Sequence, residues 1–123
     1  MDRDPLTEQV IGCAIEVHRA LGPGLLEAVY EECLCHELHE NGLGFQRQIP
    51  VPVTYKAVNL ETGFRADLVI EKELLIEIKA VERLLPVHQA QVLTYLKLSG
   101  IPKGLLLNFN TRVLKDGIRR FVM

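Results

Sequence analysis

The residues with the clearest chemical potential lie in segment 64–80, where Asp67, Glu77 and Lys79 interrupt an otherwise apolar, β-prone stretch. If residues 71–73 form a turn, the flanking strands pair so that Asp67 lies opposite Glu77. Residues directly opposite in an antiparallel pair point to the same face. Lys79 shares that face because it is two residues from Glu77. Two adjacent carboxylates repel each other unless a positive charge lies between them.

Two interpretations of this charged cluster follow. In the first, the carboxylates bind one or two Mg²⁺ or Mn²⁺ ions, and Lys79 positions a nucleophilic water or stabilises developing negative charge. In the second, the cluster is a solvated sheet face with a cross-strand salt bridge. Val69 and Leu75 lie on the same predicted face. The charges therefore border a buried patch, which favours the first interpretation.

The elements that must position these residues can be predicted from hydrophobic periodicity. A strand, a helix and a strand between residues 74 and 109 indicate a right-handed crossover and a mixed sheet. Pro50 and Pro52 suit an edge strand. The apolar stripe predicted for the second helix includes Leu26 and Val29. The predicted helices cover residues 5–21, 25–41 and 87–99. The first predicted strand region begins at residue 45 and is followed by a turn at 59–63. The later strands are predicted over 64–70, 74–80, 104–109 and 118–122.

Composition and length predict one α/β (α+β) domain over residues 1–123. The chain is 48% apolar and 24% charged, which is typical of globular proteins. It has no long apolar run and no leader-like segment, so we expect a soluble cytoplasmic protein. Three cysteines predict reduced thiols rather than a disulfide framework. The net charge of −2 argues against a protein that coats nucleic acid through bulk positive charge.

Three motifs follow one another along the chain. They are Gly24-Leu25-Leu26-Glu27-Ala28-Val29-Tyr30, then Asp67 followed by Glu77-Ile78-Lys79, and finally Gln91-Val92-Leu93-Thr94-Tyr95. In this order they resemble the PD-(D/E)xK nuclease superfamily. The first is similar to the GxxExxY signature of a group of small bacterial proteins in that superfamily. The last resembles the QxxxY element of its RecB and lambda-exonuclease branch. The residue before Asp67 is Ala66, where the superfamily signature has proline.

The resemblance implies a restriction-endonuclease-like core, with a mixed β-sheet flanked by helices, and a role for each motif residue. Asp67 and Glu77 would be the principal ligands of Mg²⁺ or Mn²⁺, joined by the backbone carbonyl of Ile78. Lys79 would be the catalytic lysine. Glu27 matches an acid that such nucleases often supply from an early helix, where it binds the metal directly or through water.

The third motif would contribute Gln91 and Tyr95, which would line the active site and orient Lys79 or the substrate phosphate. Each transferred role has an alternative. Glu27 also suits the first turn of a helix, where an acid complements the helix dipole. Gln91 and Tyr95 also suit the boundary of an ordinary amphipathic helix.

The resemblance implies a divalent-metal-dependent nuclease that acts on nucleic acid, with DNA as the expected substrate. One alternative is a nuclease-fold binding or regulatory module that has no catalytic activity of its own, and another is a purely structural subunit of an oligomer. A chain of 123 residues offers little surface for gripping a duplex. We therefore also expect a homodimer or a partner protein.

Overall fold

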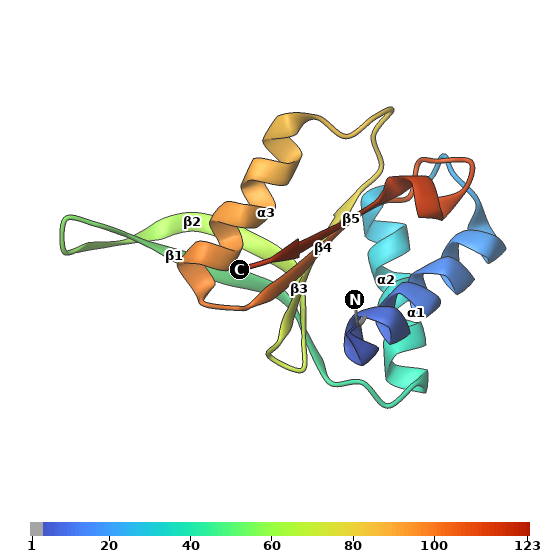
Figure 1. Ribbon diagram of the computed structural model, residues 1–123, viewed down its shortest axis with the longest axis horizontal. Coiled ribbons are helices and arrows are strands. Elements are labelled where there is room, and N and C mark those ends of the chain that lie inside the picture. Colours follow the sequence, from blue (N-terminus) through green and yellow to red (C-terminus); the bar gives the residue numbers. More distant parts are fainter. Residues whose placement is uncertain (1–3) are drawn as a thin grey trace.

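The computed structural model describes residues 4–123, except for the side chains of residues 61 and 62. A five-stranded mixed sheet separates two helices on one face from a third helix on the other (Figure 1). The elements in chain order are α1 (Pro5–Leu21), α2 (Glu27–Glu40), β1 (Phe45–Tyr55), β2 (Val58–Ile70), β3 (Leu74–Lys79), α3 (Pro86–Ser99), β4 (Lys103–Asn108), the 3₁₀ helix η1 (Leu114–Gly117) and β5 (Ile118–Val122).

The strands lie side by side in the order β1-β2-β3-β4-β5. Strands β3 and β4 are parallel and joined by α3, whereas the other neighbours are antiparallel. The predicted mixed sheet is therefore confirmed. Pro50 and Pro52 lie on β1, an edge strand, where a missing backbone donor is tolerated.

The hairpin between β2 and β3 has the predicted register. Its paired residues are Leu68 with Ile76, Val69 with Leu75, and Ile70 with Leu74. Glu71 and Lys72 have φ of 52° and 57°, which turns the chain tightly. The backbone ladder ends at the Leu68–Ile76 pair, one residue before the two acids.

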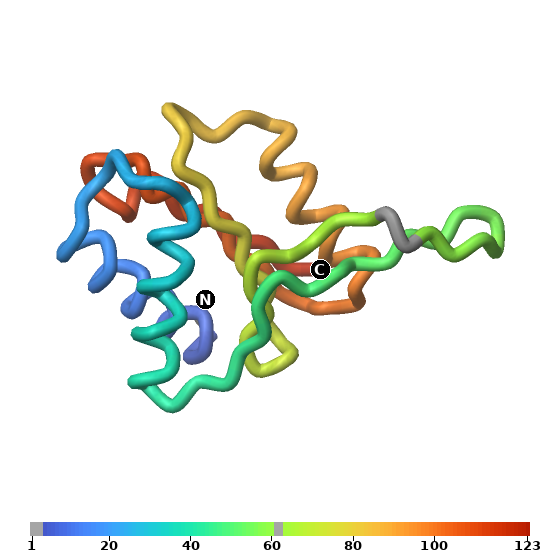
Figure 2. The backbone as a smooth tube through the Cα atoms, turned by 180° about the vertical axis from the view of Figure 1, so that it is seen from behind, coloured from blue at the N-terminus to red at the C-terminus, as the bar shows by residue number. Residues whose placement is uncertain are grey.

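The turn predicted at residues 59–63 is wrong. Strand β2 already begins at Val58, and the turn is formed by Lys56 and Ala57, whose φ values are 47° and 67°. The two strands form an arm that projects beyond the sheet (Figures 1 and 2). Gly63 instead lies inside the strand beside a register shift, where a Cβ atom would lie 2.5 Å from the Val51 carbonyl oxygen. The glycine marks a close backbone approach and not a chain reversal.

The apolar stripe predicted for the second helix is wrong at its first turn. Leu26 and Val29 are 75% and 39% exposed, because α2 begins only at Glu27 and turns other residues inward. The buried Tyr30 ring stacks on Phe109 with 4.5 Å between ring centroids, and its hydroxyl donates to the Gly22 carbonyl. These contacts fix where α2 starts.

Two apolar cores lie on the two faces of the sheet. Helices α1 and α2 cover the face that includes Leu68 and Ile76, and α3 covers the face that includes Val69 and Leu75. All three cysteines are free thiols, as predicted. None of the helices in residues 4–123 is both long and apolar enough to cross a membrane.

Asp4 supports the first helix and gives a test of the fold. Its carboxylate accepts hydrogen bonds from the Thr7 backbone N–H (2.9 Å) and hydroxyl (2.8 Å), and it pairs with Lys103 Nζ at 2.8 Å. The Lys103 ammonium, followed by the Thr7 donors, lowers the pKa of Asp4 from 3.8 to about 2. A lowered pKa stabilises the fold above the ordinary pKa, and that stabilisation disappears as the pH falls towards the folded value.

We expect Asp4→Ala to lower the free energy of unfolding by about 1 kcal/mol at neutral pH, because a helix cap and an ion pair are lost. The difference from the parent should shrink as the pH falls from 3.8 towards about 2. Urea unfolding at a series of pH values measures both effects. An equal loss at every pH would contradict the role of the Asp4 charge.

Candidate active site

Asp67 and Glu77 meet where β2 and β3 separate. The Asp67 backbone N–H donates to Glu77 Oε1 at 3.1 Å, and the Ile78 backbone N–H donates to Asp67 Oδ2 at 2.7 Å. Each carboxylate thus accepts a backbone hydrogen bond from the opposite strand beyond the end of the ladder. The predicted proximity of the two acids is present, although side-chain contacts replace the expected backbone pairing.

Strand β3 leaves β2 after Ile76 but stays paired with β4 to its last residue. Ile78 and Lys79 pair with Leu107 and Asn108 in the parallel ladder. The buried Asn108 amide then holds the chain beyond β3: its Oδ1 accepts from the Val81 N–H and its Nδ2 donates to the Val81 carbonyl, both at 3.0 Å. Sequence reasoning gave Asn108 no such role, although a polar residue ending an apolar strand was a signal.

The two acids carry an unfavourable charge arrangement. Glu77 is only 4% exposed, and burial followed by repulsion from Asp67 raises its pKa from 4.5 to about 8. Burial also raises the pKa of Asp67. Among the described residues, neither carboxylate forms an ion pair. The pair would therefore be stabilised by a cation.

Lys79 lies at the end of β3, near both acids. It is half-buried, and its positive charge lowers the pKa of Asp67 and of Glu77, although less than burial raises them. The lysine is thus electrostatically coupled to the pair without forming an ion pair in the described part of the chain.

Glu27 reaches the same strand end from α2. Its Oε2 accepts a hydrogen bond from the Ala80 N–H at 3.3 Å, and its negative charge contributes to the raised pKa of Glu77. Figure 2 shows the start of α2 and the chain after β3 close together at one end of the molecule. The first helical residue therefore lies beside the candidate site, even though it is exposed.

Tyr95 approaches from α3 on the other face of the sheet. It is 4% exposed, and burial, then the charges of Glu77 and Asp67, raise the pKa of its hydroxyl to about 12. Its ring lies 5.0 Å from that of Phe64. Tyr95 is therefore electrostatically coupled to the acidic pair.

No contact with the acidic pair supports the roles predicted for Gln91 and for the Ile78 carbonyl. Gln91 is half-buried one helical turn before Tyr95, and it makes no side-chain hydrogen bond within residues 4–123. Ile78 contacts Asp67 through its N–H, not through the carbonyl that was expected to bind metal. The structure thus couples Glu27, Asp67, Glu77, Lys79 and Tyr95 by hydrogen bonds or charge. The catalytic and metal-binding roles of these residues, of Gln91 and of the Ile78 carbonyl stay predictions.

Comparison with known protein families matches residues 4–121 to one family model, described as the PD-(D/E)XK nuclease superfamily. The chain belongs to the PD-(D/E)XK nuclease superfamily. Its mixed sheet flanked by helices is a restriction-endonuclease-like core, as expected. The match also supports a nuclease-type function. No curated protein and no solved structure matches the chain.

PD-(D/E)XK nucleases generally use divalent metal ions, and the donor chemistry of this site fits such an ion. Mg²⁺ and Mn²⁺ prefer carboxylate oxygens, and Asp67 and Glu77 are two mutually repelling carboxylates without an ion-pair partner in the described chain. No three acidic, histidine or cysteine side chains among the described residues are already arranged to hold a metal. The site therefore suits a divalent cation through its negative charge and its carboxylate ligands, and not through a preformed set of three ligands.

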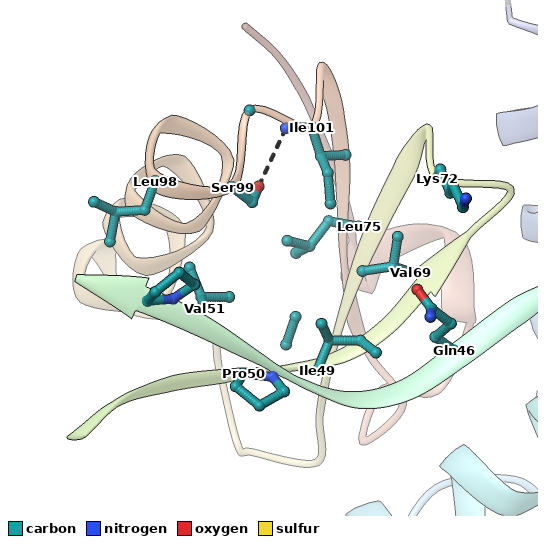
Figure 3. A pocket seen from close by; sticks show the side chains of 13 residues that line it. Gln46, Ile49, Pro50, Val51, Val69, Lys72, Leu75, Leu98, Ser99 and Ile101 are labelled. Atoms are coloured by element: carbon teal, nitrogen blue, oxygen red, sulfur yellow. Dashed lines mark hydrogen bonds between the residues drawn. The ribbon is translucent and has the colours of Figure 1, made fainter. Parts of the chain in front are cut away.

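A groove of about 440 Å³ lies elsewhere, between the β1–β2 strands and the end of α3 (Figure 3). Its walls are mostly apolar and include Ile49, Val69, Leu75 and Leu98. No acidic side chain lines it. The groove is therefore not the site formed by the superfamily motifs.

The raised pKa of Glu77 predicts how stability changes with pH in the metal-free protein. A carboxyl with a folded pKa of about 8 and an ordinary value of 4.5 leaves the fold most stable below pH 4.5, and stability falls as the pH rises towards 8. Glu77→Gln removes this ionisation and keeps an oxygen that can accept the Asp67 N–H.

We expect Glu77→Gln to be more stable than the parent by about 2–4 kcal/mol at pH 8, and to differ little from it at pH 4. Thermal or urea unfolding in the presence of a chelator measures this difference. Equal stability of parent and variant at both pH values would show that Glu77 is not strained by ionisation.

Proposed function

We propose that this protein is a divalent-metal-dependent nuclease that hydrolyses phosphodiester bonds in DNA. The observation that carries the proposal is the pair formed by the half-buried Asp67 and the buried Glu77, which lies beside Lys79 and has no ion-pair partner among the described residues. Buried like charges are costly, so a site that retains them is a candidate for binding a cation. Membership of a nuclease superfamily supports the same conclusion.

In this proposal Asp67 and Glu77 bind Mg²⁺ or Mn²⁺, with the Ile78 carbonyl as a further ligand. Glu27 binds the ion directly or through a water. Its contact with Ala80 supports this role, because it holds the carboxylate at the end of β3. When bound, such an ion would lower the pKa of a coordinated water and neutralise charge on the scissile phosphate.

Lys79 then positions the attacking water and stabilises negative charge that develops on the phosphate. Its electrostatic coupling to both acids supports this placement. Tyr95 and Gln91 orient Lys79 or the phosphate from α3. The pKa of Tyr95 is raised from 10.0 to about 12, so its hydroxyl stays protonated well above neutral pH and can donate a hydrogen bond.

The motif set also leads us to propose a place within the superfamily. The GxxExxY segment around Glu27 and the QxxxY segment ending at Tyr95 favour the GxxExxY group and a relationship to the RecB and lambda-exonuclease branch. We take residues 1–123 as one nuclease-like domain and include a homodimer or a partner protein in the proposal, since a duplex needs more contact surface.

The test is hydrolysis of single- and double-stranded DNA with Mg²⁺ or Mn²⁺. We expect Asp67→Asn, Glu77→Gln and Lys79→Ala each to lower the rate by about 100-fold or more, because each removes a charge from the site. Glu73→Ala is the matched control, since Glu73 is an exposed acid in the turn of the same hairpin. Activity that is equal in the parent and all variants would disprove the assignment.

A second candidate function is a nuclease-fold binding or regulatory module without activity of its own. It is favoured by the net charge of −2, which gives a chain of 123 residues no bulk positive charge for holding nucleic acid. Calorimetric titration with Mn²⁺ tests the site in either case. We expect binding by the parent and a loss of at least about tenfold in affinity in Glu77→Ala. Metal binding without hydrolysis of any DNA would favour the module.

A further inference from the structure

Gln48 has an unusual backbone conformation for a strand residue. Its φ is 49°, in the left-handed region that non-glycine residues seldom adopt. The flanking pairs Arg47–Leu68 and Ile49–Ala66 keep one register, so β1 continues through this residue. By the spacing of these two pairs, position 48 falls opposite Asp67. A strained backbone position persists only where the surroundings enforce it, and such positions concentrate at functional sites.

The Gln48 side chain connects a helix to the acidic pair. Its Nε2 donates to Glu31 Oε1 at 2.9 Å and to Asp67 Oδ1 at 3.4 Å. Both acceptors are carboxylate oxygens, which fixes the nitrogen end of the amide towards them. Asp67 Oδ2 meanwhile accepts from the Ile78 N–H. Each oxygen of Asp67 is therefore held by a different donor.

Glu31 is itself held in place. It lies one helical turn after Glu27 on α2 and is only 7% exposed. Its Oε2 accepts from Arg47 Nε at 3.1 Å and from Nη2 at 2.9 Å, a charge-assisted fork. Arg47 is anchored in turn by Glu32 through Nη1. The amide of Gln48 thus has a rigid support on the side opposite Asp67.

We propose that Gln48 is a positioning residue that orients the Asp67 carboxylate for metal binding, with Glu31 and Arg47 fixing the Gln48 amide. The inference rests on the proposed function, because it concerns the same metal site. Partners of metal ligands typically change metal affinity by about 10- to 100-fold when they are removed. A purely structural role would instead tie α2 to the sheet and affect stability alone.

The left-handed backbone allows these two roles to be separated. Glycine adopts a positive φ without strain, so Gln48→Gly relieves the backbone while it removes the amide. The relief offsets the lost hydrogen bonds to within about 1 kcal/mol. We therefore expect the unfolding temperature to stay within a few degrees of the parent, whereas the Kd for Mn²⁺ rises about tenfold or more.

Gln46→Gly is the matched control. Gln46 is an exposed glutamine on the same strand, makes no side-chain hydrogen bond among the described residues and pairs with Val69 in the ladder. Glycine there should lower the unfolding temperature and leave the Kd for Mn²⁺ unchanged. A second test variant is Gln48→Asn. Asparagine adopts a positive φ more readily than most residues and keeps an amide, but its side chain is too short to bridge Glu31 and Asp67.

The experiment is calorimetric titration of each variant with Mn²⁺, well below its unfolding temperature, together with thermal unfolding of the metal-free protein. Weakened binding in Gln48→Gly and Gln48→Asn, with wild-type affinity in Gln46→Gly, supports the positioning role. Wild-type affinity in both Gln48 variants overturns it and leaves the proposed function intact. Absence of Mn²⁺ binding by the parent overturns the proposed function and this inference together.

Discussion

The exchange of hydrogen bonds between Asp67 and the Glu77–Ile78 segment is the constraint on which the site depends. Strand β3 runs beside β4 along its whole length but is paired with β2 only from Leu74 to Ile76, and this leaves two backbone N–H groups beyond the end of the β2–β3 ladder. The two carboxylates accept them. A buried donor without a partner costs about 1–3 kcal/mol. The carboxylates, in place of backbone carbonyls, therefore keep the two strands joined, and they concentrate negative charge at the point of separation.

The layers of the fold bring further groups to that point from opposite faces. Helix α2 contributes Glu27 and Glu31 from the face covered by two helices, and α3 contributes Tyr95 from the other face. The stacking of Tyr30 on Phe109 joins the start of α2 to the chain just beyond β4. Packing in the apolar core therefore sets where the acid at the beginning of α2 lies, relative to the end of β3.

The site is costly for the metal-free fold in two separate ways. Glu77 is buried beside a like charge, and Gln48 has a left-handed backbone. A neutral residue at position 77 and a glycine at position 48 would make the metal-free fold more stable. Residues that are unfavourable for folding and cluster together indicate that the geometry serves another requirement, and binding of a cation between the carboxylates would meet it.

The sequence by itself determined the helices, the hairpin register and the proximity of Asp67 to Glu77, because these follow from local periodicity and from one tight turn. The sequence misplaced the turn of the first β-hairpin, because a glycine can indicate either a turn or a close backbone contact. Only the pairing of β2 with β1 shows that Gly63 belongs to the second kind. Only the tertiary structure decided that Gln48 bridges Glu31 and Asp67. The first of these hydrogen bonds spans 17 residues and the second spans 19, and no local pattern encodes such contacts.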